Sequence, residues 1–527
     1  MITLIYPPAT LPTSPYSSLP YLQGGLEQLE YKVHCIDLNV EAYDFWLSSN
    51  FNTEACSLFQ IEDAKAFLRS SELEIINAEK YLHVKKNITS YFSHINKRHI
   101  KQNLSFGGYV YPNFHFSLSN IKELSEDKTD PLNVFYNYYF TSNEIEDNYI
   151  GISITYDFQL LPGLLLTYII KKKYPNKNIF LGGASVHYLK DFFMHNRWIF
   201  DLVDLIILGD GILPITNYIN NKCHYPNSLY IDEKENIKYS EDTTVIDFQD
   251  KIIYNYSGLP LKKYFTPTLT GIVLTSIGCY YGKCAFCVPS KGKNHHYCKL
   301  SINNIIGNIR KIKTELNSDI IFFGDDCLDV KYHMKLLSSL QDSIFWQAEF
   351  RFEQNLTKPV LNLYKEKGCL QLLFGLESIS QRVLDLMKKG TNIDSICRIL
   401  SDCYQTSIRT NMQTIVGFPT ETIEEAYSTI KFMYENKEKI NSCAVSPFCL
   451  YQGSDVYCNP DKYKIEITQD NNVCKYSSSE SFDEREKEML STSFFDSISE
   501  YIPYNTFFLD GPMGNHASIY YKHNVKL

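Results

Sequence analysis

Three cysteines lie within nine residues, in the segment Cys279-Tyr-Tyr-Gly-Lys-Cys284-Ala-Phe-Cys287. The apolar run 272–277 precedes them and Gly278 ends it, which predicts a short buried strand followed by a loop. In barrel-type α/β proteins, the loops that follow the strands carry the chemistry. Three thiolates on one such loop can hold three irons of a [4Fe–4S] cluster and leave the fourth iron open to a ligand.

Zinc and a disulfide are the alternative uses of these cysteines. A zinc knuckle needs a fourth ligand, and Cys298, His295 and His296 are near in the sequence. Structural zinc usually takes two paired knuckles, however, and the sequence has no second pair. The 15 cysteines are unevenly spaced in a long chain, which is typical of a reducing compartment rather than of a disulfide scaffold. We therefore favour the cluster, with Phe286 shielding its edge.

The segment from residue 271 to about 448 resembles the radical S-adenosylmethionine (SAM) superfamily. The stretches that carry the resemblance are TSIGCYYGKCAFC, IIFFGDDCLD, WQAEFRFE, LLFGLESISQRVLDLMKKG and TIVGFPTETIEEA. One departure is the first cysteine gap, in which four residues instead of the family's three separate Cys279 from Cys284. The resemblance implies a partial (β/α)6 barrel in which Cys279, Cys284 and Cys287 hold the cluster and SAM binds its open iron.

The same resemblance implies a set of SAM contacts at the ends of the predicted strands. The Gly-Asp-Asp turn would meet the amino group of SAM, the Gly-Leu-Glu-Ser stretch its methionine or ribose part, and the Gly-Phe-Pro turn its adenine. The expected SAM-contacting residues are Phe286, Gly324, Asp325, Asp326, Arg351, Glu377, Ser378, Gly417 and Pro419. Two alternatives remain open: either aspartate could instead cap a helix, and Arg351 could pair with Glu353.

Residues 1–220 predict an open α/β domain, interrupted at about 40–147 by a polar, aromatic and mostly helical insertion. Strands alternate with helices outside the insertion, which indicates a doubly wound parallel sheet. The expected strands are 2–6, 31–37, 149–154, 179–181 and 205–208, and the expected helices are 18–29 and 160–173.

Small residues follow these strands, where a parallel sheet binds its ligands. Together they resemble the cobalamin-binding domain that precedes many radical SAM barrels. The resembling stretches are Tyr6-Pro-Pro8, Leu19-Pro-Tyr-Leu22, Asp37-Leu-Asn39, Gly151-Ile-Ser-Ile154, Leu181-Gly-Gly183 and Leu208-Gly-Asp-Gly211. The residues that this resemblance assigns to cobalamin are Pro8, Ser153, Thr155, Gly182, Gly183, Gly209, Asp210 and Gly211. The alternative is that they form tight turns only.

The chain has no Asp-x-His-x-x-Gly motif to supply a histidine below cobalt. Two interpretations stay open: a cobalamin whose lower face lacks imidazole, or a domain that kept its fold and lost the cofactor.

The remaining segments are a connector at 221–270, the barrel at 271–448 and a C-terminal region at 449–527. By resemblance, the C-terminal region shapes the substrate pocket. Four cysteines in or near it could donate a hydrogen atom to a substrate radical, or could be ordinary small buried side chains. They are Cys443, Cys449, Cys458 and Cys474.

Composition restricts the partners. The 527 residues suffice for two or three domains, and the net charge of −9 argues against broad nucleic-acid binding. The N-terminus lacks the basic start of a signal peptide, and the best apolar run, 160–170, is interrupted by Pro162. We therefore expect a cytoplasmic protein with no membrane contact.

The function implied by the resemblance is reductive cleavage of SAM to a 5′-deoxyadenosyl radical that attacks an unactivated carbon. The favoured version is cobalamin-dependent C-methylation of a peptide or natural product, with a flavodoxin- or ferredoxin-type electron donor. One alternative is a cobalamin-free peptide epimerase or cyclase that uses a cysteine hydrogen donor. An alternative of another class is a non-catalytic metal-binding protein.

Overall fold

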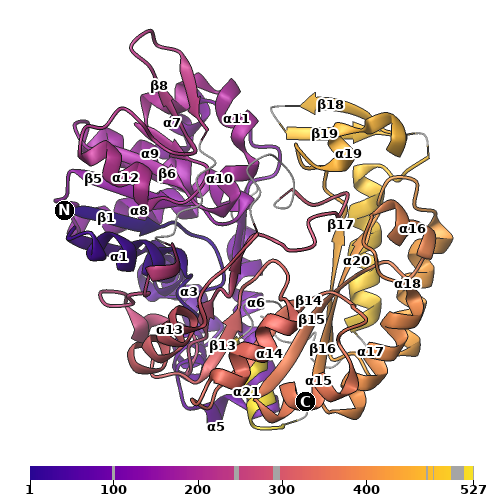
Figure 1. The fold of residues 1–527 in the computed structure, drawn as a ribbon. Coiled ribbons are helices and arrows are strands. Elements are labelled where there is room, and N and C mark those ends of the chain that lie inside the picture. Colours follow the sequence, from indigo (N-terminus) through magenta and orange to yellow (C-terminus); the bar gives the residue numbers. More distant parts are fainter. Residues whose placement is uncertain are drawn as a thin grey trace. The chain divides into compact units, whose positions relative to one another are not determined.

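A computed structural model shows how the chain folds (Figure 1). The described residues are 1–97, 101–241, 249–288, 297–470, 473–478, 480–499 and 515–525. They form two compact units, residues 1–269 with 314–316 and residues 270–313 with 317–527.

The first unit contains a seven-stranded sheet in the order β2-β1-β5-β6-β7-β8-β9. Its strands are β1 (Ile2–Tyr6), β2 (Val33–Asp37), β5 (Tyr149–Ser153), β6 (Asn178–Gly182), β7 (Leu205–Ile207), β8 (Ser228–Ile231) and β9 (Ile237–Ser240). The first five are parallel, as predicted. β8 and β9 pair antiparallel at one edge, and both lie in the segment that the sequence analysis treated as a connector.

The order in which the chain adds parallel strands to the sheet reverses between β1 and β5. From β1, the second strand from the edge, the chain goes outward to β2 and then returns to β5 on the other side of β1. Such a reversal opens a crevice at the carboxyl ends of the two strands, and ligands of open α/β sheets bind there. The predicted cobalamin contacts Pro8 and Thr155 follow these two strands.

Helices of the first unit cover the sheet and build the insertion. The helices outside the insertion are α1 (Ser18–Gln28), α9 (Leu160–Lys173), α10 (Ala184–Tyr188), α11 (Lys190–His195) and α12 (Ile212–Ile219), with short 3-10 turns η1 (Asp157–Gln159), η2 (Arg197–Asp201), η3 (Gln249–Lys251) and η4 (Leu261–Lys263). α1 packs on β1 and β2 and against α12, whereas α9 packs on β5. α9 is apolar along most of its length and ends in three lysines, which suit a helix C-terminus.

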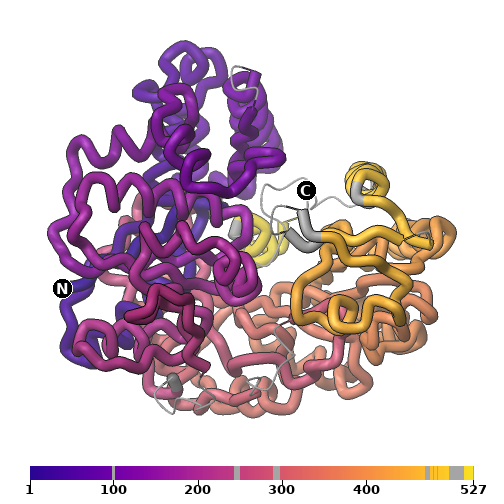
Figure 2. The backbone as a smooth tube through the Cα atoms, turned by 90° about the horizontal axis from the view of Figure 1, so that it is seen from above, coloured from indigo at the N-terminus to yellow at the C-terminus, as the bar shows by residue number. Residues whose placement is uncertain are grey.

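The insertion is a helical group at one end of the first unit, violet in Figure 2. Its elements are α2 (Leu38–Trp46), α3 (Ser49–Leu58), α4 (Ile61–Leu68), α5 (Glu72–Ile75), α6 (Ala78–Asn96), β3 (Asn103–Ser105), β4 (Gly108–Val110), α7 (Leu118–Glu126) and α8 (Pro131–Ser142). Aromatic side chains form its core. Trp46 packs edge-on against Tyr43, with ring centroids 5.2 Å apart, and its indole N–H donates to the carbonyl of Pro131 at 3.0 Å.

The second unit contains a six-stranded sheet in the order β10-β13-β14-β15-β16-β17, and every pairing in it is parallel. The strands are β10 (Gly271–Val273), β13 (Ile320–Phe323), β14 (Phe345–Phe350), β15 (Cys369–Glu377), β16 (Arg409–Val416) and β17 (Ser442–Pro447). This confirms the predicted six-stranded partial barrel.

The strand expected at 272–277 is divided in two. β10 ends at Val273, and β11 (Ser276–Ile277) pairs antiparallel with β12 (Cys298–Lys299). The physical reason is Asp325, because its carboxylate accepts hydrogen bonds from the backbone N–H of Thr275 and thereby takes the place of a neighbouring strand. The cysteine loop begins just after this irregular segment.

Helices surround the sheet of the second unit. They are α13 (Ile302–Glu315), α14 (Val330–Ser339), α15 (Lys358–Glu366), α16 (Gln381–Leu386), α17 (Ile393–Gln405) and α18 (Ile423–Glu435). On β14, Trp346 packs toward α14 and α15, where it contacts the rings of His333 and Tyr364. Since side chains alternate along a strand, Gln347, Glu349 and the following Arg351 face the opposite way, into the barrel.

The C-terminal region adds further elements to the second unit: α19 (Asp455–Cys458), η5 (Pro460–Tyr463), β18 (Glu466–Asp470), β19 (Val473–Ser477), α20 (Glu484–Ser499) and α21 (Asn515–Lys522). α20 packs against β17 and α18, and α21 contacts β15. At α21, Tyr521 receives a hydrogen bond from Gln371 at 3.5 Å and its ring lies under the guanidinium of Arg409.

Candidate functional site

The cysteine loop is held in place by two consecutive tyrosines. The Tyr280 hydroxyl donates to Glu353 Oε1 at 2.6 Å, just beyond β14. The Tyr281 hydroxyl donates to the carbonyl of Lys388 at 2.6 Å, just beyond α16. Both tyrosines lie in the four-residue gap that departs from the family's cysteine spacing. The longer gap is therefore a defined, anchored part of the loop.

The three loop cysteines are free and partly buried. A hydrogen bond from the Cys327 thiol, helped by the backbone N–H groups of Gly282 and Tyr281, lowers the pKa of Cys279 to about 6. Burial raises the pKa of Cys284, although the charges of Lys389 and Arg351 oppose that rise. Because metal clusters bind thiolates, a low thiol pKa and nearby cations both favour cluster binding.

The residues present fit an iron–sulfur cluster by their chemistry. Three thiols share one loop, and Arg351 Nη1 lies 3.9 Å from Cys284 Sγ, where it can offset the charge of an anionic cluster. Among the described residues, no three Cys, His, Asp or Glu side chains are already gathered as a metal site. The fit of this site to a cluster therefore depends on the chemistry of the three thiols and on their position in one loop.

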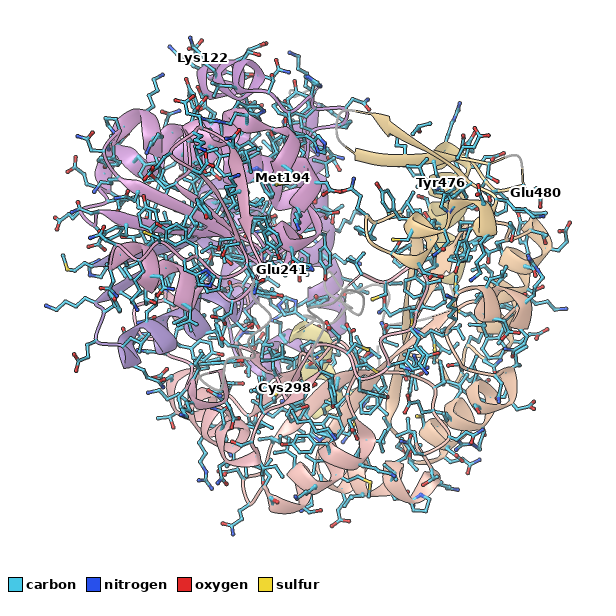
Figure 3. All side chains as sticks on the ribbon, turned by 45° about the horizontal axis from the view of Figure 1, so that its top comes forward. Lys122, Met194, Glu241, Cys298, Tyr476 and Glu480 are labelled. Atoms are coloured by element: carbon cyan, nitrogen blue, oxygen red, sulfur yellow. The ribbon has the colours of Figure 1, made fainter. Side chains whose placement is uncertain are left out.

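The zinc alternative has weaker support. Of its ligands, His295 and His296 lie outside the described residues. Cys298, labelled in Figure 3, lies on β12, where its thiol is near the carbonyl of Lys299 at 3.7 Å.

Asp325 and Asp326 have different environments. Asp325 is 3% exposed, and its carboxylate accepts from Thr275 Oγ1 at 2.8 Å and Ser276 Oγ at 2.7 Å in addition to the Thr275 backbone. Burial raises its pKa to about 6. The Asp326 carboxylate is exposed to solvent, yet the surrounding protein desolvates it enough to raise its pKa. Asp325 is thus committed to the fold, whereas Asp326 is available to a ligand.

Arg351 joins the cysteine loop to the carboxyl end of β14. It is 6% exposed, its Nε donates to Glu353 Oε1 at 3.2 Å, and its guanidinium lies 3.1 Å from the centre of the Tyr281 ring. It also donates to the carbonyl of Lys389. The ion pair with Glu353, left open by the sequence, is present.

Glu377 and Ser378 point to different partners. A bulge at the end of β15 and a positive φ of 59° at Glu377 direct its carboxylate to Lys389 Nζ, 2.5 Å away. The Ser378 side chain is fully buried and lies 3.3 Å from Thr429 Oγ1 on α18. Glu377 therefore lies beside the cysteine loop, and Ser378 contacts a covering helix.

The Gly417–Pro419 turn is covered by the C-terminal region. Gly417 has a φ of +80°, and a side chain there would approach Lys487 Cγ to 2.3 Å. Lys487 Nζ donates to the carbonyl of Phe448 and to the Tyr476 hydroxyl, both at 3.1 Å. Tyr476, labelled in Figure 3, in turn donates to the carbonyl of Gly417 at 3.3 Å. Phe286 packs into the neighbouring apolar cluster, which includes Phe418.

Sequence reasoning missed three residues of the site: Glu349, Lys389 and Cys327. Burial, reinforced by the charge of Asp326, raises the pKa of Glu349 to about 7. Its signal was present in the stretch WQAEFRFE, where polar residues occupy alternate positions. Lys389 and Cys327 carried no such signal, because only the fold brings them to the cysteine loop.

The floor of the barrel is a polar layer. Ser442 Oγ accepts from Gln371 Nε2 at 3.0 Å and from Asn411 Nδ2 at 2.7 Å, and Gln413 donates to Asn411. The buried Gln347 Nε2 has no hydrogen-bond partner among the described residues. An unused donor inside the barrel is suited to a polar ligand.

In the first unit, Thr155 is the strongest ligand-binding candidate. Its hydroxyl is buried at the β1/β5 reversal and has no hydrogen-bond partner among the described residues, although the Tyr6 hydroxyl is near. Ser153 Oγ, by contrast, lies 3.0 Å from Ser18 Oγ. Pro8 is buried in the same turn. An orphaned hydroxyl at a ligand-binding crevice is compatible with a bound cobalamin.

Of the glycines predicted to admit cobalamin, Gly183 is required by the protein's own backbone packing. Gly183 has a φ of +113°, and a side chain there would lie 2.2 Å from the carbonyl oxygen of Ile154. Side chains at Gly209 and Gly211 would meet Asn227 and Leu22, and at Gly182 the nearest atom would be 3.5 Å away. Asp210 accepts from the Tyr21 hydroxyl and from the backbone N–H of Ile212.

The candidate hydrogen-donor cysteines differ in exposure. Cys443 is 2% exposed on β17, whereas Cys449 and Cys458 are exposed. The side chain of Cys474 lies outside the described residues.

Comparison with known proteins agrees with this arrangement. Residues 273–433 match the family model of the radical SAM superfamily. An uncharacterized methyltransferase of Pyrococcus horikoshii is 27% identical over 271 residues, which cover 49% of this chain and 58% of that protein. The chain thus spans little more than half of this relative's length.

Two solved structures share the fold over nearly the whole chain. The radical SAM methyltransferase TsrM from Kitasatospora setae, solved with cobalamin and a [4Fe–4S] cluster, has a TM-score of 0.57 at 13% identity and covers 94% of this chain and 84% of its own. The cobalamin-dependent radical SAM enzyme OxsB, solved with aqua-cobalamin and SAM, has a TM-score of 0.61 at 14% identity and covers 95% and 67%. These likenesses show a common fold.

Within the described part of the chain, none of the helices combines the length and the apolar character needed to cross a membrane.

Proposed function

We propose that this chain, a member of the radical SAM superfamily, is a cobalamin-dependent methyltransferase that cleaves SAM at a [4Fe–4S] cluster and methylates an unactivated carbon. The observation that carries the proposal is the cysteine loop. It follows the first strand of a six-stranded parallel sheet and lies against Arg351, Lys389 and Glu377. The whole-chain likeness to TsrM and OxsB supports the cobalamin part.

Cys279, Cys284 and Cys287 would hold the cluster, which supplies the electron for SAM cleavage when it is bound. Arg351 offsets charge at Cys284 and fixes the loop through Tyr281. Asp326 is the candidate for the SAM ammonium, because its carboxylate is exposed and a cation pairs with it favourably. Asp325 acts by positioning that turn.

Gly324, Glu377 and Ser378, with Gly417 and Pro419, would complete the SAM site by resemblance. Of these, Glu377 would act through its ion pair with Lys389. Phe286 would shield the cluster edge, because it packs into the apolar cluster under the C-terminal region.

In the first unit, cobalamin would carry the methyl group when bound. Thr155 would give its unused hydroxyl to that ligand. The remaining predicted contacts, Pro8, Ser153, Gly182, Gly183, Gly209, Asp210 and Gly211, would line the same edge of the sheet. The domain division proposed from the sequence assigns residues 449–527 to shaping the substrate pocket.

The proposed substrate is a peptide or a small natural product, and the proposed reductant is a flavodoxin- or ferredoxin-type protein. A pocket of about 540 Å³ lies beside the cysteine loop and would let the reductant approach it. Lys283 and Lys388 line it together with Asp385 and Asp455, so side chains of both charges flank the loop from outside. Every cysteine whose side chain is described is free, which supports a reducing cytoplasm.

The test is anaerobic reconstitution with iron, sulfide and hydroxocobalamin, followed by removal of unbound ligand and analysis of iron and cobalt. We expect about four irons per chain with stoichiometric cobalt, and loss of iron but not of cobalt in Cys287→Ser. Four irons without cobalt would favour the epimerase or cyclase alternative. Zinc in place of iron, with no SAM cleavage under reduction, would favour a non-catalytic metal-binding protein.

A further inference from the structure

A fourth thiol contacts the cysteine loop. Cys327 follows β13 and is 3% exposed, and its thiol is hydrogen-bonded to that of Cys279 and to the Tyr280 hydroxyl. Cys279 is the first cysteine of the proposed cluster motif. A side chain that touches this sulfur lies next to any cluster that the sulfur binds.

The turn that carries Cys327 is fixed on both sides. The neighbouring Asp325 is bound by Thr275 and Ser276, and the backbone N–H of Leu328 donates to the carbonyl of Glu349 at 3.3 Å. The backbone around Cys327 is therefore held on both sides.

A positive charge also lies near Cys327, although the contact with Cys279 and burial raise the pKa of the Cys327 thiol. The Arg351 guanidinium interacts electrostatically with Cys327 as well as with Cys284. One cation thus faces a thiol of the motif and the additional thiol together. Four cysteines are the usual complement of a [4Fe–4S] cluster. Among the described side chains, Cys327 is a thiol outside the motif that contacts this site.

We propose that Cys327 ligates the fourth iron of the cluster while SAM is absent, and that SAM displaces it. The inference rests on the proposed function, because it requires the cluster. On displacement, the bond from iron to Cys327 sulfur breaks, a bond from iron to the methionyl part of SAM forms, and the released thiolate takes a proton from solvent. No electron is transferred.

The same turn links this exchange to SAM binding. Asp326, whose exposed carboxylate is the candidate for the SAM ammonium, directly precedes Cys327. SAM would therefore engage the turn at the residue beside the thiol that it replaces. In the absence of SAM, the fourth iron would be protected from solvent and oxidant.

The test compares the reconstituted protein with Cys327→Ala and Cys327→Ser, and with Cys403→Ser as a control. Cys403 is buried on α17, distant in sequence from the loop. Each protein is oxidised with ferricyanide without SAM, and its iron content and electron paramagnetic resonance spectrum are recorded. We expect the wild type and the control to keep four-iron clusters, and both Cys327 variants to lose one iron and show a three-iron signal.

A second measurement is SAM affinity by equilibrium dialysis. If SAM must displace a thiolate, Cys327→Ala should bind SAM several-fold more tightly than the wild type, whereas a residue that only supports the fold would weaken binding when removed. Equal iron loss in all four proteins, or unchanged or weaker SAM binding in Cys327→Ala, would overturn the inference and leave the proposed function intact. A wild type that takes up no cluster would overturn both.

Discussion

Glu377 and Lys389 form an ion pair that is buried on both sides, since each side chain is only 8% exposed and the two charged atoms lie 2.5 Å apart. The positive φ of Glu377 and the bulge in β15 bring the carboxylate to the lysine. Lys389 Nζ also lies 5.7 Å from the centre of the Phe286 ring, and its positive charge opposes the rise in the pKa of Cys284. The pair therefore joins the end of β15 to the cysteine loop.

Breaking this pair should destabilise the second unit strongly. Lys389→Met leaves the Glu377 carboxylate buried and unpaired, which costs about 3–5 kcal/mol. The matched control is Lys388→Met, because Lys388 pairs with Asp455 at 2.6 Å but its side chain is 41% exposed, so its loss costs about 0–1 kcal/mol. Urea unfolding followed by Trp346 fluorescence, in cluster-free protein with the other two tryptophans replaced, measures both. Equal losses in the two variants would contradict the prediction.

Substitutions of the two neighbouring aspartates should have different effects, on stability for Asp325 and on ligand binding for Asp326. Asp325→Ala leaves several buried donors on Thr275 and Ser276 without an acceptor, so we expect a loss of about 3 kcal/mol in unfolding free energy. Asp326→Ala should change stability by less than about 0.5 kcal/mol and weaken SAM binding about tenfold or more, since it removes a charge-assisted contact. Thermal unfolding and dialysis of the reconstituted protein provide the two readouts. The reverse pattern would show that Asp325 is the ligand contact.

Glu349 should make the stability of the second unit depend on pH. Burial and the charges of Asp326 and Glu377 raise its pKa to about 7, and Lys389 only partly opposes them. A raised carboxyl pKa means that the folded state favours the protonated form, so stability is full below pH 4 and falls as the pH rises to 7. Glu349→Gln should therefore match the wild type at pH 4 and exceed it at pH 8.

Glu366→Gln is the control for that measurement, because Glu366 is exposed on α15. Urea midpoints at the two pH values are compared for the three proteins. A Glu349→Gln protein with the same pH dependence as the wild type would refute the assignment of this titration to Glu349.

Gly417 should tolerate no side chain because of Lys487. Gly417→Ala places a methyl group 2.3 Å from Lys487 Cγ at a φ of +80°, and we expect a loss of about 2–3 kcal/mol. Gly453→Ala is matched, since its φ is +82° but its nearest atom, on Val288, is 3.8 Å away. It should cost about 1 kcal/mol from backbone strain alone. Limited proteolysis of the C-terminal region, beside thermal unfolding, would show whether the collision displaces α20.

The sequence predicted the architecture well because its signals were local. Apolar runs, several of them followed by glycine, placed the strands of both sheets, and the cysteine spacing placed the loop. The prediction of one strand over 272–277 was wrong. The residue that divides this strand, Asp325, is about 50 residues away in the sequence. β8 and β9 were missed because each has only four residues, and β9, at the edge of the sheet, is partly exposed.

The candidate site could be predicted only in part, because contacts between residues far apart in the sequence decide the role of each side chain. Motif position alone treated Asp325 and Asp326 as equals, and their environments distinguish them only through contacts with Thr275 and Ser276. Cys327 is separated from Cys279 by 48 positions, and no spacing rule connects them. Side-chain direction at a strand end depends on the bulge and the neighbouring strand, which a single sequence does not display.

The last helix has a consequence for the order in which the second unit matures. Tyr521 of α21 contacts Gln371 and Arg409, which are made more than 100 residues earlier. Lys487 likewise covers Gly417 from a later part of the chain. The barrel therefore remains incomplete until the residues of α21 have been synthesised. Iron would then be loaded only after α21 has been made, and a product that stops before α21 would expose its thiols before the site can protect a cluster.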